Sequence, residues 1–238
     1  MKSLLHIPIP KIPPEKKART VRFLNRYSLL FHILLSMLLC FAIEVISRHS
    51  IEKAFGFVAL HTWAFAYNSF IIFASLTLVY LVRRRALARI VISGLWIFLG
   101  TVNGCILSNR VTPFGYTDLK CISDLLSMQN TNYFSAAEAT AVVCIVGLFI
   151  AFCVYLFFKG PKFQGRRRKF LTPCMVAFCF LMLPVTTHAA QNSNILASYF
   201  ANIAQGYENY GFVYGFSTSV VDRGMSKPDQ YSKESVAA

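Results

Sequence analysis

Seven polar residues stand out because their types suit the binding of phosphate or of one another. They combine cationic, anionic, amide and hydroxyl side chains, and they are Glu44, Arg48, Asn68, Asn103, Arg110, Thr112 and Asp118. Arginine in particular can hold a phosphate group through two parallel hydrogen bonds. Most of the seven lie within or next to long apolar runs, so their meaning depends on what those runs are.

The composition predicts an integral membrane protein. Of 238 residues, 55% are hydrophobic and only 14% are charged, whereas about a quarter are charged in a typical soluble domain. The apolar residues form runs of about twenty, the length that crosses a bilayer as a helix. The expected fold is therefore all-α, a bundle of five transmembrane helices with short interfacial helices. The expected spans are 27–46, 63–82, 90–107, 136–158 and 171–190, which together make a transmembrane domain over 27–190.

Three further segments complete the expected layout. Residues 1–26 are basic and rich in proline, which indicates a cytosolic tail. Residues 191–216 are expected to form an outer interfacial helix region, because its apolar residues recur at helical spacing at Ile195, Leu196, Tyr199, Phe200 and Ile203. Residues 217–238 are polar and indicate an extracellular linker.

The positions of the basic residues predict the orientation. Most of the 24 lysines and arginines lie in 1–26, 83–89 and 159–169. Short basic segments stay on the cytoplasmic side, so the N-terminus is expected in the cytoplasm and the C-terminus outside, in a multi-pass protein of the cell membrane. The net charge of +14 then reflects topology and contact with anionic inner-leaflet lipid, and nucleic acid is not an expected partner.

With this orientation the candidate residues lie toward the outer side. Glu44 and Arg48 are four residues apart, the spacing at which they face each other on a helix. Asn68 and Asn103 fall in the outer thirds of their spans. We expect a polar pocket at the outer leaflet, although a simple ion pair and interhelical hydrogen bonds would explain the same residues.

The segment Leu107–Lys120 has two interpretations. Thr112 and the following proline favour a turn, and Asp118 suits a helix N-cap. A turn alone does not need Arg110 at its entrance. We therefore also interpret Arg110, Thr112 and Asp118 as residues that bind a lipid headgroup or dock another domain.

Four stretches carry a family resemblance. They are "EVISRHS" after the first run, an asparagine in the second, "NRVTPFGYTDLK" after the third and "YGFVYGFSTSVVDRGMSKPDQYS" near the end. The chain resembles the membrane part of lipoteichoic acid synthase-like proteins, which are sulfatase-like phosphotransferases of the alkaline phosphatase superfamily. The resemblance covers about Arg26 to Ser232 and implies five transmembrane helices before an extracellular catalytic domain.

The resemblance also implies a function. Members of the lipoteichoic acid synthase-like family transfer glycerol phosphate from phosphatidylglycerol, using a threonine nucleophile and manganese in the extracellular domain. This sequence ends at Ala238, where that domain would begin, so no catalytic, cofactor or metal residue is expected in it. We expect a membrane anchor and lipid-presenting module that binds a phosphatidylglycerol-like lipid and an extracellular catalytic domain or subunit. The alternative is an autonomous small membrane protein, either a lipid-binding regulator or a partner-recruiting subunit.

Overall fold

The protein is all-helical in the parts that the structure describes. The computed structural model describes residues 27–121, 136–160 and 170–221, with the backbone alone for 136–143. Within these ranges there is no strand. The elements are α2 (Ser28–Arg48), α3 (Ile51–Leu60), α4 (Thr62–Thr77), the 3-10 helix η1 (Leu78–Leu81), α5 (Arg85–Leu107), α6 (Tyr116–Lys120), α8 (Ala136–Lys159), α9 (Leu171–Asn192), α10 (Ile203–Tyr210) and α11 (Phe212–Val221).

Four helices are long and apolar enough to cross a membrane. They are Ser28–Arg48, Thr62–Leu81, Arg85–Leu107 and Leu171–Asn192. They match four of the five predicted spans, which confirms an all-α fold and is consistent with a membrane protein. The remaining predicted span, 136–158, coincides with α8, a helix of 24 residues. Because its side chains are described only from Cys144 onward, a total of five spans stays a prediction.

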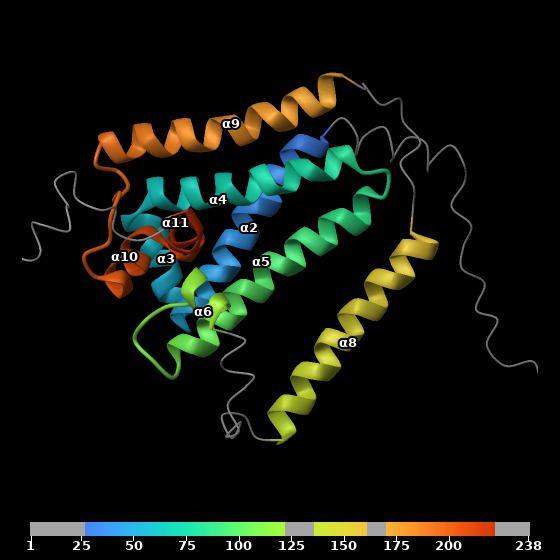
Figure 1. Ribbon diagram of the computed structural model, residues 1–238, viewed down its shortest axis with the longest axis horizontal. Helices are drawn as coiled ribbons and strands as arrows, with labels where there is room; N and C mark the ends of the chain where they lie inside the picture. Colours follow the sequence, from blue (N-terminus) through green and yellow to red (C-terminus); the bar gives the residue numbers. More distant parts are fainter. Residues whose placement is uncertain (1–26, 122–135, 161–169, 222–238) are drawn as a thin grey trace, which may run out of the picture.

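The centre of the bundle is formed by α2, α4 and α5 (Figure 1). Close approach of α2 and α5 depends on glycine, since a Cβ on Gly104 would lie 2.9 Å from the carbonyl oxygen of Ile46. Small residues allow such backbone approach between membrane helices. The buried side chains of Ile43, Ile72 and Leu76 fill the space between these helices.

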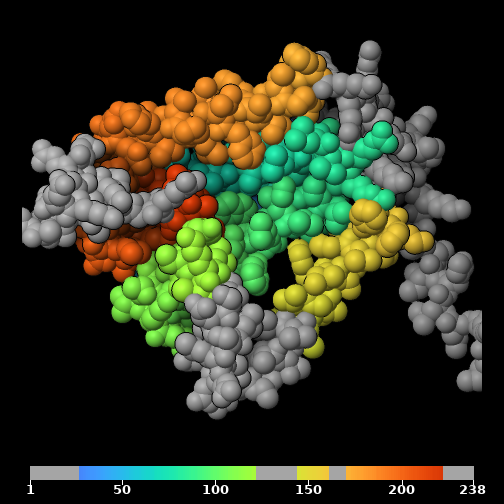
Figure 2. All heavy atoms as spheres, in the orientation of Figure 1, coloured from blue at the N-terminus to red at the C-terminus, as the bar shows by residue number. Residues whose placement is uncertain are grey.

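Two helices lie at the periphery. α9 packs against α4, where the hydroxyl groups of Tyr67 and Thr187 form a hydrogen bond. α8 packs against α5, with the ring of Phe149 over Gly94. Most of the described side chains of α8 are apolar and exposed (Figure 2). A helix that is apolar on nearly all sides suits contact with lipid tails.

The short helices α3, α6, α10 and α11 gather at one end of the bundle, which we call the capped end (Figure 1). The opposite end carries the arginines of 83–89, where α5 begins. At the capped end the residues 108–121 lie beside α10 and α11 (Figure 2). Residues 108–121 and α10 to α11 come from distant parts of the sequence, so tertiary contacts hold these two parts of the cap together.

The C-terminal part differs from the expected layout. The apolar spacing over 195–203 predicted helix, but residues 193–202 form turns and bends. α10 starts only where the side chain of Asn202 accepts a hydrogen bond from the backbone N–H of Gln205, at 3.3 Å. α11 continues to Val221, so residues 217–221 are helical where an extended linker was expected. The predicted tail 1–26 and the rest of the predicted linker, 222–238, lie outside the described residues.

Candidate functional site

The capped end is organised around the corner between α10 and α11. Gly211 forms this corner with a φ of +86°, a conformation that side chains other than glycine rarely adopt. A Cβ at Gly211 would also lie 2.9 Å from both the Asn68 Nδ2 and the Glu44 Oε1 atoms. The corner therefore packs closely against Asn68 and Glu44, which are two of the seven residues singled out in the sequence.

Glu44 lies inside the bundle and bonds to the start of α11. The residue is 1% exposed. Its Oε1 atom accepts a hydrogen bond from the backbone N–H of Phe212 at 3.0 Å, and its Oε2 atom accepts one from Arg48 Nε at 2.9 Å. The first N–H groups of a helix have no partner within it, and a negative charge is favourable beside them. Glu44 on α2 thus caps α11.

Asn68 holds both sides of the same corner. Its Nδ2 atom donates to the carbonyl oxygen of Tyr210, at the end of α10, over 2.7 Å. Its Oδ1 atom accepts from the backbone N–H of Tyr214, in the first turn of α11, over 2.6 Å. Asn68 is completely buried. The Asn68 amide therefore provides hydrogen-bond partners for one backbone group at the end of α10 and one at the start of α11.

Arg48 links Glu44 to α10, because it bonds to both of them. Its Nη2 atom donates to the carbonyl oxygen of Glu208 at 2.7 Å. Its guanidinium group lies over the ring of Phe57 on α3, with Cζ 4.4 Å from the ring centroid. The predicted pairing with Glu44 is thus part of a larger connection between α2, α3 and α10.

Asn103 likewise bonds to backbone, in this case to the segment that follows α5. Its Oδ1 atom accepts from the backbone N–H of Phe114 at 2.8 Å, and its Nδ2 atom donates to Ser47 Oγ at 3.0 Å. Asn103 is 1% exposed. The ring of Phe114 stacks on that of Phe216, with centroids 5.6 Å apart. This segment is thereby attached to α5 and α11, and Asn103 also links α5 to α2.

Arg110 and Asp118 pair with each other across the turn. Arg110 Nη2 lies 2.7 Å from Asp118 Oδ2, and Arg110 Nε donates to the carbonyl oxygen of Thr112 at 2.9 Å. Asp118 Oδ2 also accepts from the backbone N–H of Gly115 at 2.9 Å. The pair therefore shapes the turn, as the turn interpretation expects. Both side chains remain partly exposed, at 43% and 27%. The N-cap of α6 is Gly115 and not Asp118, because Asp118 lies three residues further on and bonds back to the Gly115 N–H.

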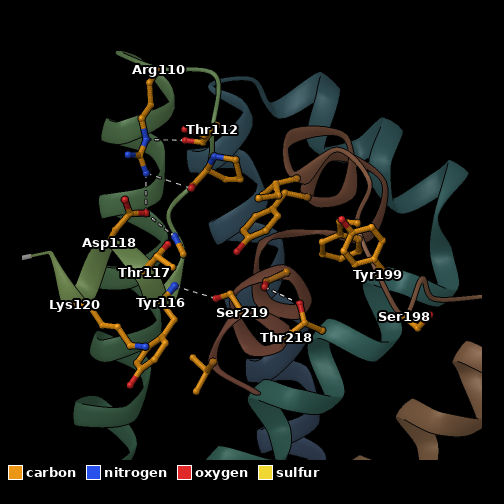
Figure 3. A pocket seen from close by; sticks show the side chains of 17 residues that line it. Arg110, Thr112, Tyr116, Thr117, Asp118, Lys120, Ser198, Tyr199, Thr218 and Ser219 are labelled. Carbon is orange, nitrogen blue, oxygen red and sulfur yellow. Dashed lines mark hydrogen bonds and ion pairs between the residues drawn. The ribbon is translucent and has the colours of Figure 1, made fainter. Parts of the chain in front are cut away.

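A cavity of about 920 Å³ opens beside this turn, and we call it the large cavity. Arg110, Asp118 and Lys120 line one side of it, and Ser198 and Tyr199 lie across from them (Figure 3). Hydroxyl groups of α11 lie between these two sides. The remaining lining is largely aromatic and apolar and includes Tyr116, Phe200, Ile203 and Tyr207.

The seven predicted residues do not form one site. Arg110, Thr112 and Asp118 line the large cavity. Glu44, Arg48 and Asn103 line a second one of about 270 Å³, which we call the small cavity. Asn68 lines neither of these two cavities and bonds only to backbone groups.

Several residues of the large cavity were not selected from the sequence. Lys120 lies with its Nζ atom 4.9 Å from the centroid of the Tyr116 ring. The backbone N–H of Tyr116 donates to Ser219 Oγ at 3.0 Å, which ties α6 to α11. The four-residue spacing of Tyr116 and Lys120 could have indicated that these two side chains face each other on a helix. The partnership with Ser219 leaves no local pattern in the sequence.

Tyr207 separates the two cavities and lines both of them. Its hydroxyl group donates to the carbonyl oxygen of Phe114 at 3.2 Å. Burial raises the pKa of Tyr207 to about 12, because removal from water disfavours the phenolate. Tyr207 is therefore a neutral hydrogen-bond donor over the whole physiological pH range.

The described residues of the capped end offer two cavities lined by polar and aromatic side chains. No group of three His, Cys, Asp or Glu side chains there is placed to hold a metal ion. What the geometry offers is two cavities of different size and polarity on a cap tied to the bundle. No family model, curated protein or solved structure matches the chain.

Proposed function

We propose that the chain is a membrane anchor and lipid-presenting module, similar in role to the membrane part of lipoteichoic acid synthase-like glycerol-phosphate transferases. In this proposal the capped end faces the outside of the cell membrane. The large cavity binds the headgroup of an anionic lipid such as phosphatidylglycerol.

The lining of the large cavity is the observation that carries this proposal. Two cations, Arg110 and Lys120, stand against a single carboxylate, Asp118. The hydroxyl group of Thr117 adds a donor for phosphate oxygens. The hydroxyl groups of Thr218 and Ser219 donate to the backbone carbonyl oxygens of Gly215 and Phe216, so they shape the wall of the cavity. Aromatic and apolar side chains complete the lining, and ligand sites commonly combine such walls with a few polar groups.

The position of α11 supports a role in presentation. Val220 and the preceding two residues line the large cavity, so the chain passes the cavity just before Val221. We propose that a catalytic domain or subunit attached after this point takes the headgroup from the cavity. The nucleophile and the manganese ion that the resemblance implies would belong to that domain, and this chain would supply the lipid.

The test is lipid binding by paired lysine variants. We would reconstitute the protein in nanodiscs of phosphatidylcholine with and without phosphatidylglycerol and measure retention of the anionic lipid. Lys120→Met should weaken that retention, whereas Lys53→Met, a lysine at the capped end outside the large cavity, should not. Equal retention by the wild type and Lys120→Met would reject the large cavity as the headgroup site.

Arg110→Ala is a second, less selective variant. A charge-assisted hydrogen bond contributes about 1.5–3 kcal/mol, so its loss should weaken lipid binding by an amount in that range. Because Arg110 also holds Thr112 and Asp118, the variant should disturb the turn as well. Asp118→Asn provides the comparison, since it breaks the ion pair and leaves the cation in the cavity.

A further inference from the structure

The small cavity has no role in the function proposed above, and its lining differs from that of the large cavity. It measures about 270 Å³ and lies between α2, α5 and α10 at the capped end. Pro113 and Tyr207 line both cavities and form the wall between them. The inference that follows rests on this second cavity and does not depend on lipid binding in the first.

The floor of the small cavity consists of buried polar side chains. Glu44 and Asn103 are each 1% exposed, and Ser47 is 9% exposed. Such groups are costly to bury unless their hydrogen bonds are made. A cavity with this floor is suited to a polar occupant rather than to a lipid tail.

Hydrogen-bond donors remain available around the cavity. Asn103 Nδ2 carries two hydrogens, and among the described residues one acceptor, Ser47 Oγ, is found for them. The Nη1 atom of Arg48 has no hydrogen-bond acceptor in the part of the chain that the structure describes. Lys53 Nζ likewise has no carboxylate partner within those ranges. Three residues that line the cavity therefore have donors available.

The charges around the cavity balance. Glu44 and Glu208 carry the negative charges, and Arg48 and Lys53 carry the positive ones. The buried carboxylate of Glu44 would oppose an oxyanion, while the lone pairs of its oxygens and the Ser47 hydroxyl can accept from a ligand. A neutral cavity that offers both donors and acceptors matches hydroxyl groups, which both donate and accept.

The size of the cavity limits the ligand. Sites for drug-sized molecules have volumes of about 300–1,000 Å³, so 270 Å³ corresponds to a smaller group. We propose that the small cavity binds a neutral polyol group, with adjacent hydroxyls contacting Asn103, Lys53 and Glu44. The group is supplied either by a free polyol or by the uncharged sugar headgroup of a glycolipid.

The experiment compares a variant that fills the cavity with a matched control. Ala204 on α10 lines the small cavity only, whereas Gln205 is exposed and lines neither cavity. Ala204→Leu should occupy the space, and Gln205→Leu adds the same side chain to the same helix outside it. Protein in phosphatidylcholine nanodiscs, which avoid glycoside detergents, would be titrated with methyl glucoside and glycerol, with ligand-observed NMR as the readout.

Wild-type protein and Gln205→Leu should bind the free polyols saturably, and Ala204→Leu should bind them at least about tenfold more weakly, a loss of 1.4 kcal/mol. Nanodiscs that contain monoglucosyl diacylglycerol form the second arm. Binding in that arm alone would assign the group to a lipid headgroup, and binding of the free polyols would assign it to a soluble ligand. Both results support the cavity.

A second variant guards against a folding defect in Ala204→Leu. Lys53 is exposed, so Lys53→Met should leave thermal unfolding unchanged and still weaken polyol binding. Lys120→Met, in the other cavity, should leave polyol binding intact. The proposal is overturned if neither arm shows saturable binding, if both small-cavity variants bind as the wild type does, or if inorganic phosphate competes as well as the polyols. None of these results bears on lipid retention in the large cavity.

Discussion

Glu44 and Asn68 lie on different long helices, yet they cap the same helix of the C-terminal region. Glu44 on α2 accepts the backbone N–H of Phe212, and Asn68 on α4 accepts that of Tyr214. Both N–H groups belong to the first turn of α11. Polar residues placed within apolar spans here complete a neighbouring helix, which gives each of them a structural reason to be buried.

Asn68→Leu should destabilise the protein. The substitution leaves the N–H of Tyr214 and the carbonyl group of Tyr210 without their partner in a buried position. Loss of a partner in such a setting costs about 1–3 kcal/mol for each group left unpaired. The free energy of unfolding in mild detergent would measure this loss. Asn109→Leu, an exposed asparagine beyond the end of α5, is the control and should be nearly neutral.

Gly211→Ala should destabilise the protein, in contrast to a glycine-to-alanine change at an open helical position of the capped end. Its φ of +86° disfavours a side chain, and the new Cβ would crowd Asn68 and Glu44. Gly56 in α3 is the matched control, since a Cβ there meets no atom within 4 Å. Gly56→Ala should stabilise by about 0.4–1 kcal/mol. Similar thermal unfolding of both variants would contradict the strained corner.

The long helices were predictable because each depends on its own residues. Length and hydropathy locate α2, α5 and α9 to within a few residues, and the Glu44–Arg48 pair follows from helical spacing alone. The cap was not predictable in this way. Asn68 and Asn103 bond to backbone groups far along the chain, and side-chain spacing does not encode such partners. In 195–203 the ring of Phe200 packs against Tyr210 and Tyr214, so this apolar residue reflects tertiary packing and not the face of a local helix.

Tyr207 should lose its proton at a higher pH than the exposed tyrosines do. Its folded pKa is raised from 10 to about 12 by burial, so the folded state favours the neutral phenol. The stabilisation is complete below pH 10 and is lost as the pH rises from 10 toward 12. Ultraviolet absorbance of tyrosinate, followed together with unfolding, would show this. Tyr207→Phe should reduce the late component, to which Tyr214 also contributes because burial raises its pKa, and should lose the hydrogen bond to Phe114. An unchanged titration curve would show that another residue is responsible.

The orientation of the two ends can be tested with single cysteines. The basic residues of 83–89 predict that this end faces the cytoplasm, which places the capped end outside. In a background without the seven native cysteines, Val111→Cys probes the capped end and Arg83→Cys probes the other. Both positions are exposed, so access is set by the membrane and not by burial. In intact cells an impermeant maleimide should label position 111 and reach position 83 only after permeabilisation. The reverse pattern would invert the bundle and would place both cavities on the cytoplasmic side, away from any extracellular domain.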